Sequence, residues 1–200
     1  MSGLSGRFNQ FIGKTRFMVC RVFIHLGGEE VAPLLGVLNQ AARDAVEEAE
    51  GDLGVLGEGL VNLCQSLLEY SSSWRSAANE GDVLWDEGEA GDYVTELFTD
   101  SAARYLSSSE VGLEDSRKPL TLPATRNLVV MITAACEGEV PELETDLAEI
   151  DALETGLKAL INLHYQERLR AIQVHYSPAQ LGDELTDEQV LLNFPELIPL

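Results

Sequence analysis

Long apolar runs, cysteine pairs and basic residues are all scarce in this chain of 200 residues. No segment approaches the roughly 20 apolar residues that a membrane-spanning helix needs, and the start of the chain lacks the apolar stretch of a secretion signal. The three cysteines, Cys20, Cys64 and Cys136, are widely spaced among apolar residues and include no C-x-x-C pair. These absences predict a soluble, cytoplasmic protein with no transmembrane segment, buried reduced thiols and no zinc site.

The 13 basic residues are outnumbered by 34 acidic ones and are unevenly placed. Residues 1–28 carry four bases and no acid, whereas residues 29–200 carry 9 bases and 34 acids, a net charge of −25. The strong negative charge of residues 29–200 repels phosphate groups, which argues against a nucleic-acid partner.

Residues 1–16 form a basic arm in which Leu4, Phe8, Phe11 and Ile12 recur at roughly helical spacing. Two interpretations stay open for this arm. It is either an ordinary frayed start of the domain or an amphipathic segment that makes a peripheral contact with an anionic membrane or an acidic partner.

Three segments rich in β-branched and aromatic residues predict strands, at residues 17–26, 127–136 and 169–176. The first two are almost continuously apolar, as expected inside a sheet. Alternate residues of the first strand form a wholly apolar face, and the others form a mixed one. The apolar face consists of Met18, Cys20, Val22, Ile24 and Leu26.

Apolar residues at helical spacing predict helices over residues 31–50, 53–70, 92–106 and 147–165. Asp52 is the expected N-cap of the second helix, and Thr186 with Gln189 predicts a capping box that begins a short fifth helix. Near the C-terminus, strand, helix and strand follow within about 50 residues, the spacing of a parallel crossover. The prediction is one α+β domain over residues 17–200, with a small, mainly parallel three-stranded sheet and about five helices packed largely on one face.

Polar residues and prolines predict two flexible surface loops, near residues 71–91 and 107–124. Trp74 and Trp85 lie in the first loop, where each is either a core anchor or an anchor of a protein interface. The C-terminal residues Phe194, Leu197 and Ile198 are expected to fold back on the core.

Motifs that carry catalysis or bind nucleotides are absent: there is no G-x-S-x-G turn and no phosphate-binding glycine loop after a strand. We therefore expect no catalytic residue, cofactor or metal. The best polar constellation lies on the mixed face of the predicted sheet. It consists of Arg21, His25, Thr133, Gln173 and His175. These residues form either an anion-binding or partner-binding face, or a structural face that water or a helix covers.

The C-terminal third also carries a distinctive pattern of short motifs. They are Val174, Ser177-Pro178, Leu185-Thr186, Glu188, Leu191-Leu192, Phe194-Pro195-Glu196-Leu197 and Pro199-Leu200. With the order of elements and Trp74 after the second helix, they resemble the domain-of-unknown-function family of cyanobacteria and chloroplasts that includes the thylakoid fluctuating-light-acclimation proteins. The family's membrane segment, Gly/Ser-rich leader and Arg-His-Pro cluster have no counterpart here, so membrane embedding does not carry over.

The resemblance implies an accessory role in photosynthetic regulation, without established catalytic residues. The function we expect is that of a non-enzymatic regulatory or assembly protein. It would act through protein–protein contacts, in the cytoplasm or peripherally at the thylakoid membrane. The alternative is a small-ligand or pH sensor, or an unrecognised enzyme, that uses the polar sheet face with its two histidines. A large apolar surface would favour the first function, and a closed pocket that holds the histidines would favour the second.

Overall fold

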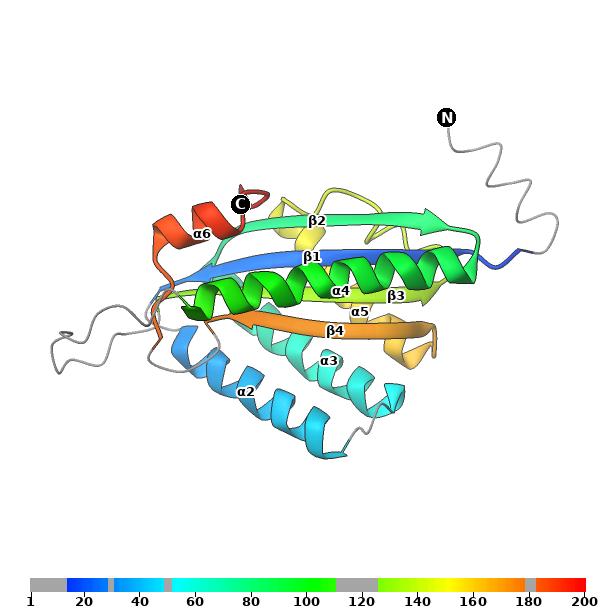
Figure 1. Ribbon diagram of the computed structural model, residues 1–200, viewed down its shortest axis with the longest axis horizontal. Coiled ribbons are helices and arrows are strands. Elements are labelled where there is room, and N and C mark those ends of the chain that lie inside the picture. Colours follow the sequence, from blue (N-terminus) through cyan, green and yellow to red (C-terminus); the bar gives the residue numbers. More distant parts are fainter. Residues whose placement is uncertain (1–13, 29–30, 49–51, 111–125, 179–182) are drawn as a thin grey trace, which may run out of the picture.

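A five-stranded sheet runs through the molecule in the computed structural model, which describes residues 14–28, 31–48, 52–110, 126–178 and 183–200 (Figure 1). The strands are β1 (Phe17–Gly27), β2 (Trp74–Leu84), β3 (Asn127–Glu137), β4 (Leu169–Ser177) and β5 (Ile198–Pro199), in the order β4-β3-β1-β2-β5. The helices of the described residues are α2 (Val31–Glu48), α3 (Leu53–Glu69), α4 (Glu87–Glu110), α5 (Ile150–Tyr165) and α6 (Asp187–Asn193). The α+β class is as predicted, but the sheet is not.

The predicted parallel three-stranded sheet is wrong, because every pair of neighbouring strands is antiparallel. β1 lies between β2 and β3, and β3 pairs with β4 on its other side. The segment that contains α5 therefore joins two antiparallel neighbours instead of crossing over between parallel strands. A connection long enough to hold a helix can join either two parallel or two antiparallel strands. The length of the connection alone therefore could not decide between the two arrangements.

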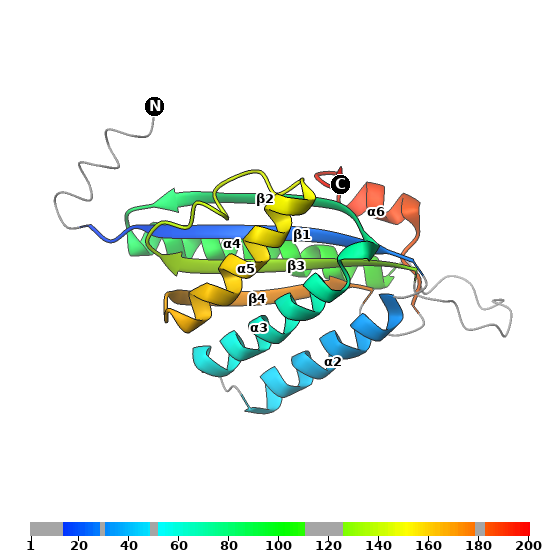
Figure 2. The ribbon, with the colours of Figure 1, turned by 180° about the vertical axis from the view of Figure 1, so that it is seen from behind.

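Helices cover both faces of the sheet, as the front and back views show (Figures 1 and 2). α2, α3 and α5 lie on the face that the alternation in β1 predicts to be apolar, and its five apolar residues are all buried in the main core. α4 and α6 lie on the opposite face, where two smaller clusters contain Phe17, Val19 and Phe23. The prediction of helices largely on one face is wrong because the mixed face also carries large apolar side chains that need cover.

Residues 71–91, predicted as a surface loop, form a 3-10 turn at Ser71–Ser73, then β2, then the start of α4. β2 has no sequence pattern of an ordinary strand because its buried positions after Trp74 are the small residues Ser76, Ala77 and Ala78, and residues 80–82 are exposed. Gly81 packs directly against β1: a Cβ at this position would lie 2.3 Å from Val19 O. The close approach of the two backbones explains a glycine inside a strand.

The second predicted loop, residues 107–124, also starts too early, because α4 continues to Glu110. The rest of that prediction lies outside the described residues, as do positions 1–13 of the basic arm. The three predicted strands are confirmed, and each is extended by one residue.

The predicted helix caps are confirmed. Asp52 Oδ1 accepts a hydrogen bond from Gly54 N at 2.7 Å, and Thr186 and Gln189 form the capping box of α6. The C-terminal residues fold back as expected: Phe194 is buried, β5 pairs with β2, and Leu200 N donates to Arg75 O at 3.0 Å. No helix in the described parts of the chain is long and apolar enough to cross a membrane.

Candidate functional site

The predicted polar residues lie on the sheet face beneath α4. In the strand register, Arg21 lies opposite Glu80 on one side and Thr133 on the other, and Thr133 lies opposite Gln173. Four polar side chains thus form one row across four strands. Only 2% of Arg21 and 1% of Thr133 are exposed, so this part of the face is closed to solvent.

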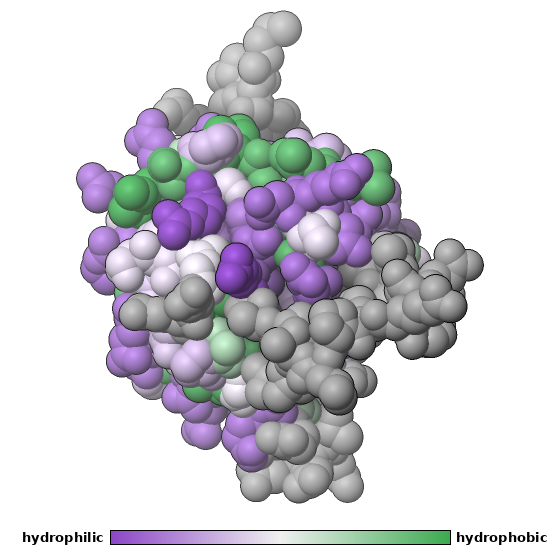
Figure 3. Space-filling view, turned by 90° about the vertical axis from the view of Figure 1, so that its left-hand side faces the viewer, coloured by the Kyte–Doolittle hydropathy of each residue, from purple (hydrophilic) through white to green (hydrophobic). Residues whose placement is uncertain are grey.

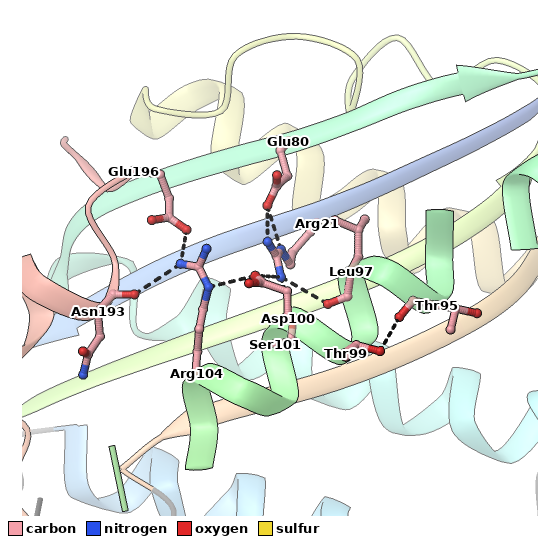
Figure 4. Close-up of polar contacts among 10 residues, drawn as sticks. All are labelled: Arg21, Glu80, Thr95, Leu97, Thr99, Asp100, Ser101, Arg104, Asn193 and Glu196. Atoms are coloured by element: carbon pink, nitrogen blue, oxygen red, sulfur yellow. Dashed lines mark hydrogen bonds and ion pairs between the residues drawn. The ribbon is translucent and has the colours of Figure 1, made fainter. Parts of the chain in front are cut away.

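Arg21 is the centre of an ion-pair network that ties α4 to the sheet (Figure 4). Its Nε donates to Glu80 Oε1 at 2.8 Å, and its Nη1 lies 2.7 Å from Asp100 Oδ2. The same Nη1 donates to Leu97 O at 3.1 Å and to Ser101 Oγ at 2.9 Å. The guanidinium is therefore fully occupied by β2 and α4.

Arg104 continues this network to the C-terminal tail. Its Nε donates to Asp100 Oδ2 at 2.8 Å, and its Nη1 forms an ion pair with Glu196 and donates to Asn193 O at 3.2 Å. The guanidinium carbons of Arg21 and Arg104 lie 4.8 Å and 5.5 Å from the centre of the Phe23 ring. Through these two cation–π contacts, the ion-pair network packs against Phe23 of β1.

The carboxyl group of Asp100 bridges the two arginines. Its partial burial acts to raise its pKa, but the hydrogen bond from Arg21 and the positive charge of Arg104 outweigh this effect and hold the pKa below its ordinary value. Asp100 is therefore ionised at neutral pH, and the network holds α4 in place rather than supplying a proton.

The two histidines do not form one site. His25 lies on β1 opposite Val129, whereas His175 lies on β4 opposite Met131, so they are two strands apart. Adjacent strands lie about 4.8 Å apart, so the backbones of the two histidines are separated by at least twice that spacing. The two rings therefore cannot bind the same small group.

Both histidines are half-buried, and burial lowers the pKa of each. In His25, the hydrogen bond to Asn127 and the charge of Asp187 only partly offset this effect. In His175, the charge of Arg21 lowers the pKa further. Both imidazoles are consequently neutral at neutral pH.

His25 borders an open pocket of about 690 Å³ at the end of the sheet. Its ring nitrogens lie 3.1 Å from Ser76 Oγ and 3.1 Å from Asn127 Oδ1. Arg75 and Arg126 also line the pocket, and neither forms an ion pair with a carboxylate of the described residues. Hydrophilic side chains gather at this end of the molecule (Figure 3).

A second hollow, of about 640 Å³, is an apolar groove between α2, α3 and the edge strand β4. Its lining includes Val37, Ala41, Val55, Leu56, Ile172 and Val174. Val37 is 41% exposed, and Gly59, which also lines the groove, has no atom within 4 Å of the position of a Cβ. β4 pairs only with β3, so its outer edge has no partner strand among the described residues.

The two tryptophans have different environments. Trp74 is buried in the main core, although its Nε1 has no hydrogen-bond partner among the described residues. Trp85 lies half-buried between β2 and α4. Trp74 therefore packs as a core anchor, and the interface role of Trp85 stays a prediction.

Two features were missed from the sequence. The first is the network around Arg21. Within it, only the pair of Asp100 and Arg104 gives a sequence pattern, the i, i+4 spacing of an ion pair on a helix. The second is the groove, because the apolar residues of α2 and α3 were all assigned to the core. The described residues contain no group of three or more histidine, cysteine, aspartate or glutamate side chains suited to a metal ion.

Comparison with known proteins gives one result. The family described as "Protein of unknown function (DUF1517)" matches residues 16–200. No curated protein and no solved structure matches the chain significantly. Because the family match spans all five strands and the C-terminal tail, the chain belongs to this family of proteins of unknown function.

Proposed function

We propose that this chain is a non-enzymatic regulatory or assembly protein that acts through protein–protein contacts. The apolar groove between α2, α3 and β4 carries the proposal. An apolar hollow between two helices is the kind of surface into which a partner helix lays its apolar face. The polar residues of the opposite face support the same conclusion, because Arg21 is engaged in holding α4.

The second part of the proposal is the cellular setting, which we infer to be the photosynthetic membrane. The support is the resemblance of the tail motif Phe194-Pro195-Glu196-Leu197 to the thylakoid fluctuating-light-acclimation proteins. The protein then works in the cytoplasm or peripherally at the thylakoid membrane, where the partner would be regulated or assembled.

A matched pair of variants tests the groove as a partner site. Gly59→Leu should fill the groove, and its Cβ has room because nothing lies within 4 Å of that position. Gly36→Leu is the control, since Gly36 is equally free of neighbours but lies on the exposed side of α2, outside the groove. In affinity capture from a native photosynthetic host under steady and fluctuating light, we expect the wild type and Gly36→Leu to recover the same partner and Gly59→Leu to lose it. Equal recovery with all three proteins would contradict the proposal.

A second candidate function is that of a small-anion sensor. The open pocket beside His25 favours it, because Arg75 and Arg126 line it and form no ion pair with a carboxylate of the described residues. Glu184 and Asp187 line the same pocket, so an anion would have to bind on its arginine side. Anion binding would raise the melting temperature of the folded protein as phosphate is added. Arg126→Gln should abolish this shift, and a wild type that shows no shift would exclude phosphate as the ligand.

A further inference from the structure

One wall of the apolar groove is a strand edge rather than a helix. The outer edge of β4 has no partner strand among the described residues, and from Ala171 onward its pairing with β3 is regular. An edge strand directs alternate N–H and C=O groups away from the sheet, where another chain can bond to them. β4 contains no lysine, proline or acidic residue that would discourage such pairing, and Arg170 at its start is paired with Glu137 of β3. The edge is therefore suited to accept a further strand.

The helices beside this edge reach further than the sheet does. In both views, α2 lies beyond the outer edge of β4, and α3 crosses that edge (Figures 1 and 2). The groove is the hollow that these two helices share with β4. A strand added beside β4 would lie in this hollow, with α2 and α3 covering one of its faces. On this side the sheet is thus one strand narrower than its helical cover.

The covered face of an added strand would meet apolar surroundings. Ile172 and Val174 pack against the main core, so the residues opposite them would turn their side chains toward α2 and α3. Val37 and Val55 line the groove there, and the position of a Cβ on Gly59 has no atom within 4 Å. Two apolar side chains, two residues apart, therefore fit this face.

Gln173 lies between these two positions and also lines the groove. Its Oε1 is buried and has no hydrogen-bond partner among the described residues. A buried acceptor without a donor is unfavourable, and the amide can turn toward the groove without breaking a bond of Oε1. Side chains directly opposite each other on neighbouring strands lie about 5 Å apart. An amide on the added strand could therefore both donate to Gln173 and accept from it.

A second copy of this chain does not suit the edge. Pairing of two β4 strands about a two-fold axis would place the projecting helices of both copies on the same face, in the same space. Each copy also carries a net charge of −21, so two copies repel each other. Of the described lining residues, only Glu58 is charged. A complementary segment is therefore apolar at its centre and basic at its ends.

We propose that the partner enters the groove as an extended segment that pairs with β4 as a further strand, with an amide between two apolar residues. Gln173 is then the residue that determines specificity, through a hydrogen bond to the amide of the partner. The idea rests on the proposed function, because it names the class of partner segment that the same groove takes. A helix would fill the hollow but leave the edge of β4 unpaired.

A synthetic peptide tests the pairing. The probe is fluorescein-labelled Lys-Val-Thr-Val-Gln-Val-Thr-Val-Lys, and its binding to the full chain is followed by fluorescence anisotropy. We expect saturable binding to the wild type and to Gly36→Leu, and an affinity at least about tenfold lower for Gly59→Leu, which fills the groove. Absence of saturation with the wild type up to about 1 mM peptide would overturn the proposal.

Methylation of the peptide nitrogens separates a strand from a helix. Only every second N–H group of an added strand faces β4. Two further peptides are therefore compared, one N-methylated at its valines and the other at its threonines and glutamine. One of them should keep its affinity, and the other should lose at least about tenfold. Either methylation would disrupt a bound helix, so equal losses, like equal retention, would overturn the strand.

An exchange of side chains tests the role of Gln173. Leucine in place of the central glutamine of the peptide should weaken binding to the wild type at least about fivefold, because the amide of Gln173 then has no partner. Gln173→Leu should reverse this preference without lowering the melting temperature, since Oε1 has no donor to lose. The same preference in both proteins would overturn the role of Gln173. No preference in the wild type would overturn it without the variant.

Partner capture separates a failure of this inference from a failure of the proposed function. Lost recovery with Gly59→Leu, together with equal effects of the two methylated peptides, would reject the added strand and leave the groove as the partner site. Full recovery with Gly59→Leu would reject both.

Discussion

A Cβ atom on Gly57 of α3 would lie 2.2 Å from Nδ1 of His164 in α5. Gly57 therefore allows the two helices to pack in close contact on the main face of the sheet. Gly59 lies two residues further along the same helix and faces open space. The two glycines form a natural pair for comparison.

Gly57→Ala should destabilise the protein by about 1–3 kcal/mol, because the imidazole or the helix must move to relieve the contact. Gly59→Ala should instead stabilise it by up to about 1 kcal/mol, since alanine loses less conformational entropy in a helix and meets no neighbour. Urea unfolding of both variants measures the difference. Effects of the same sign would contradict the close packing of α3 on His164.

Arg21→Met should reduce the free energy of unfolding by about 2–4 kcal/mol. Glu80 and Asp100 can regain water, but the fully buried hydroxyl of Ser101 loses its donor. Lys158→Met is the control, because its ion pair with Glu154 lies on the exposed surface of α5 and should contribute no more than about 0.5 kcal/mol. Equal losses in urea unfolding would show that the network does not hold α4.

The histidines predict a loss of stability in mild acid. Burial lowers the pKa of His25 and His175 in the folded protein, whereas in the unfolded chain both titrate near pH 6.5. The unfolded chain consequently binds more protons as the pH falls below about 6.5, and folding stability decreases until the folded-state pKa values are passed. The double variant His25→Gln with His175→Gln should flatten the dependence of the unfolding free energy on pH between about 7 and 5.

The carboxylates act in a separate, more acidic range, which serves as an internal control. The pKa of Asp100 and that of Glu144 are lowered in the folded protein, so their stabilising effect is lost only as the pH falls below about 4. The histidine variant should leave this second loss unchanged. A wild type equally stable at pH 7 and pH 5 would contradict the lowered histidine pKa values.

The three thiols should be unreactive in the folded protein. Burial raises the pKa of Cys20 to about 12 and that of Cys136 to about 11, and it also raises the pKa of Cys64. Because the thiolate is the reacting form, Ellman's reagent should label none of them within minutes and all three in denaturant. Rapid labelling of one thiol before unfolding would show that its part of the core opens locally.

The strands and helix caps could be predicted because their causes are local. β1 and β3 are almost continuously apolar, and the contacts of Asp52 and Thr186 lie within three residues of each cap. β2 could not be predicted, because its strand conformation depends on pairing with β1 over its full length rather than on its own composition. The direction of the strands was likewise undetermined, since antiparallel neighbours accept a connection of any length.

The polar row was predictable from alternation along three strands, which places Arg21, Thr133 and Gln173 on one face. What covers this face was not predictable. The partners of Arg21 come from β2 and α4, 59 and 76 residues away for the bonds to Glu80 and Leu97. Residues so distant in sequence are brought together by the tertiary fold, and no local pattern records them.

The central position of β1 also affects how the chain folds. Both of its neighbours come from far along the sequence, with Leu26 paired to Trp74 and Phe17 paired to Glu137. The entropy of closing such long loops must be lost before the pairing can compensate for it, which makes folding slow. Until β3 arrives, the most apolar strand of the sheet stays uncovered, so we expect β1 to be the segment that a chaperone binds during refolding.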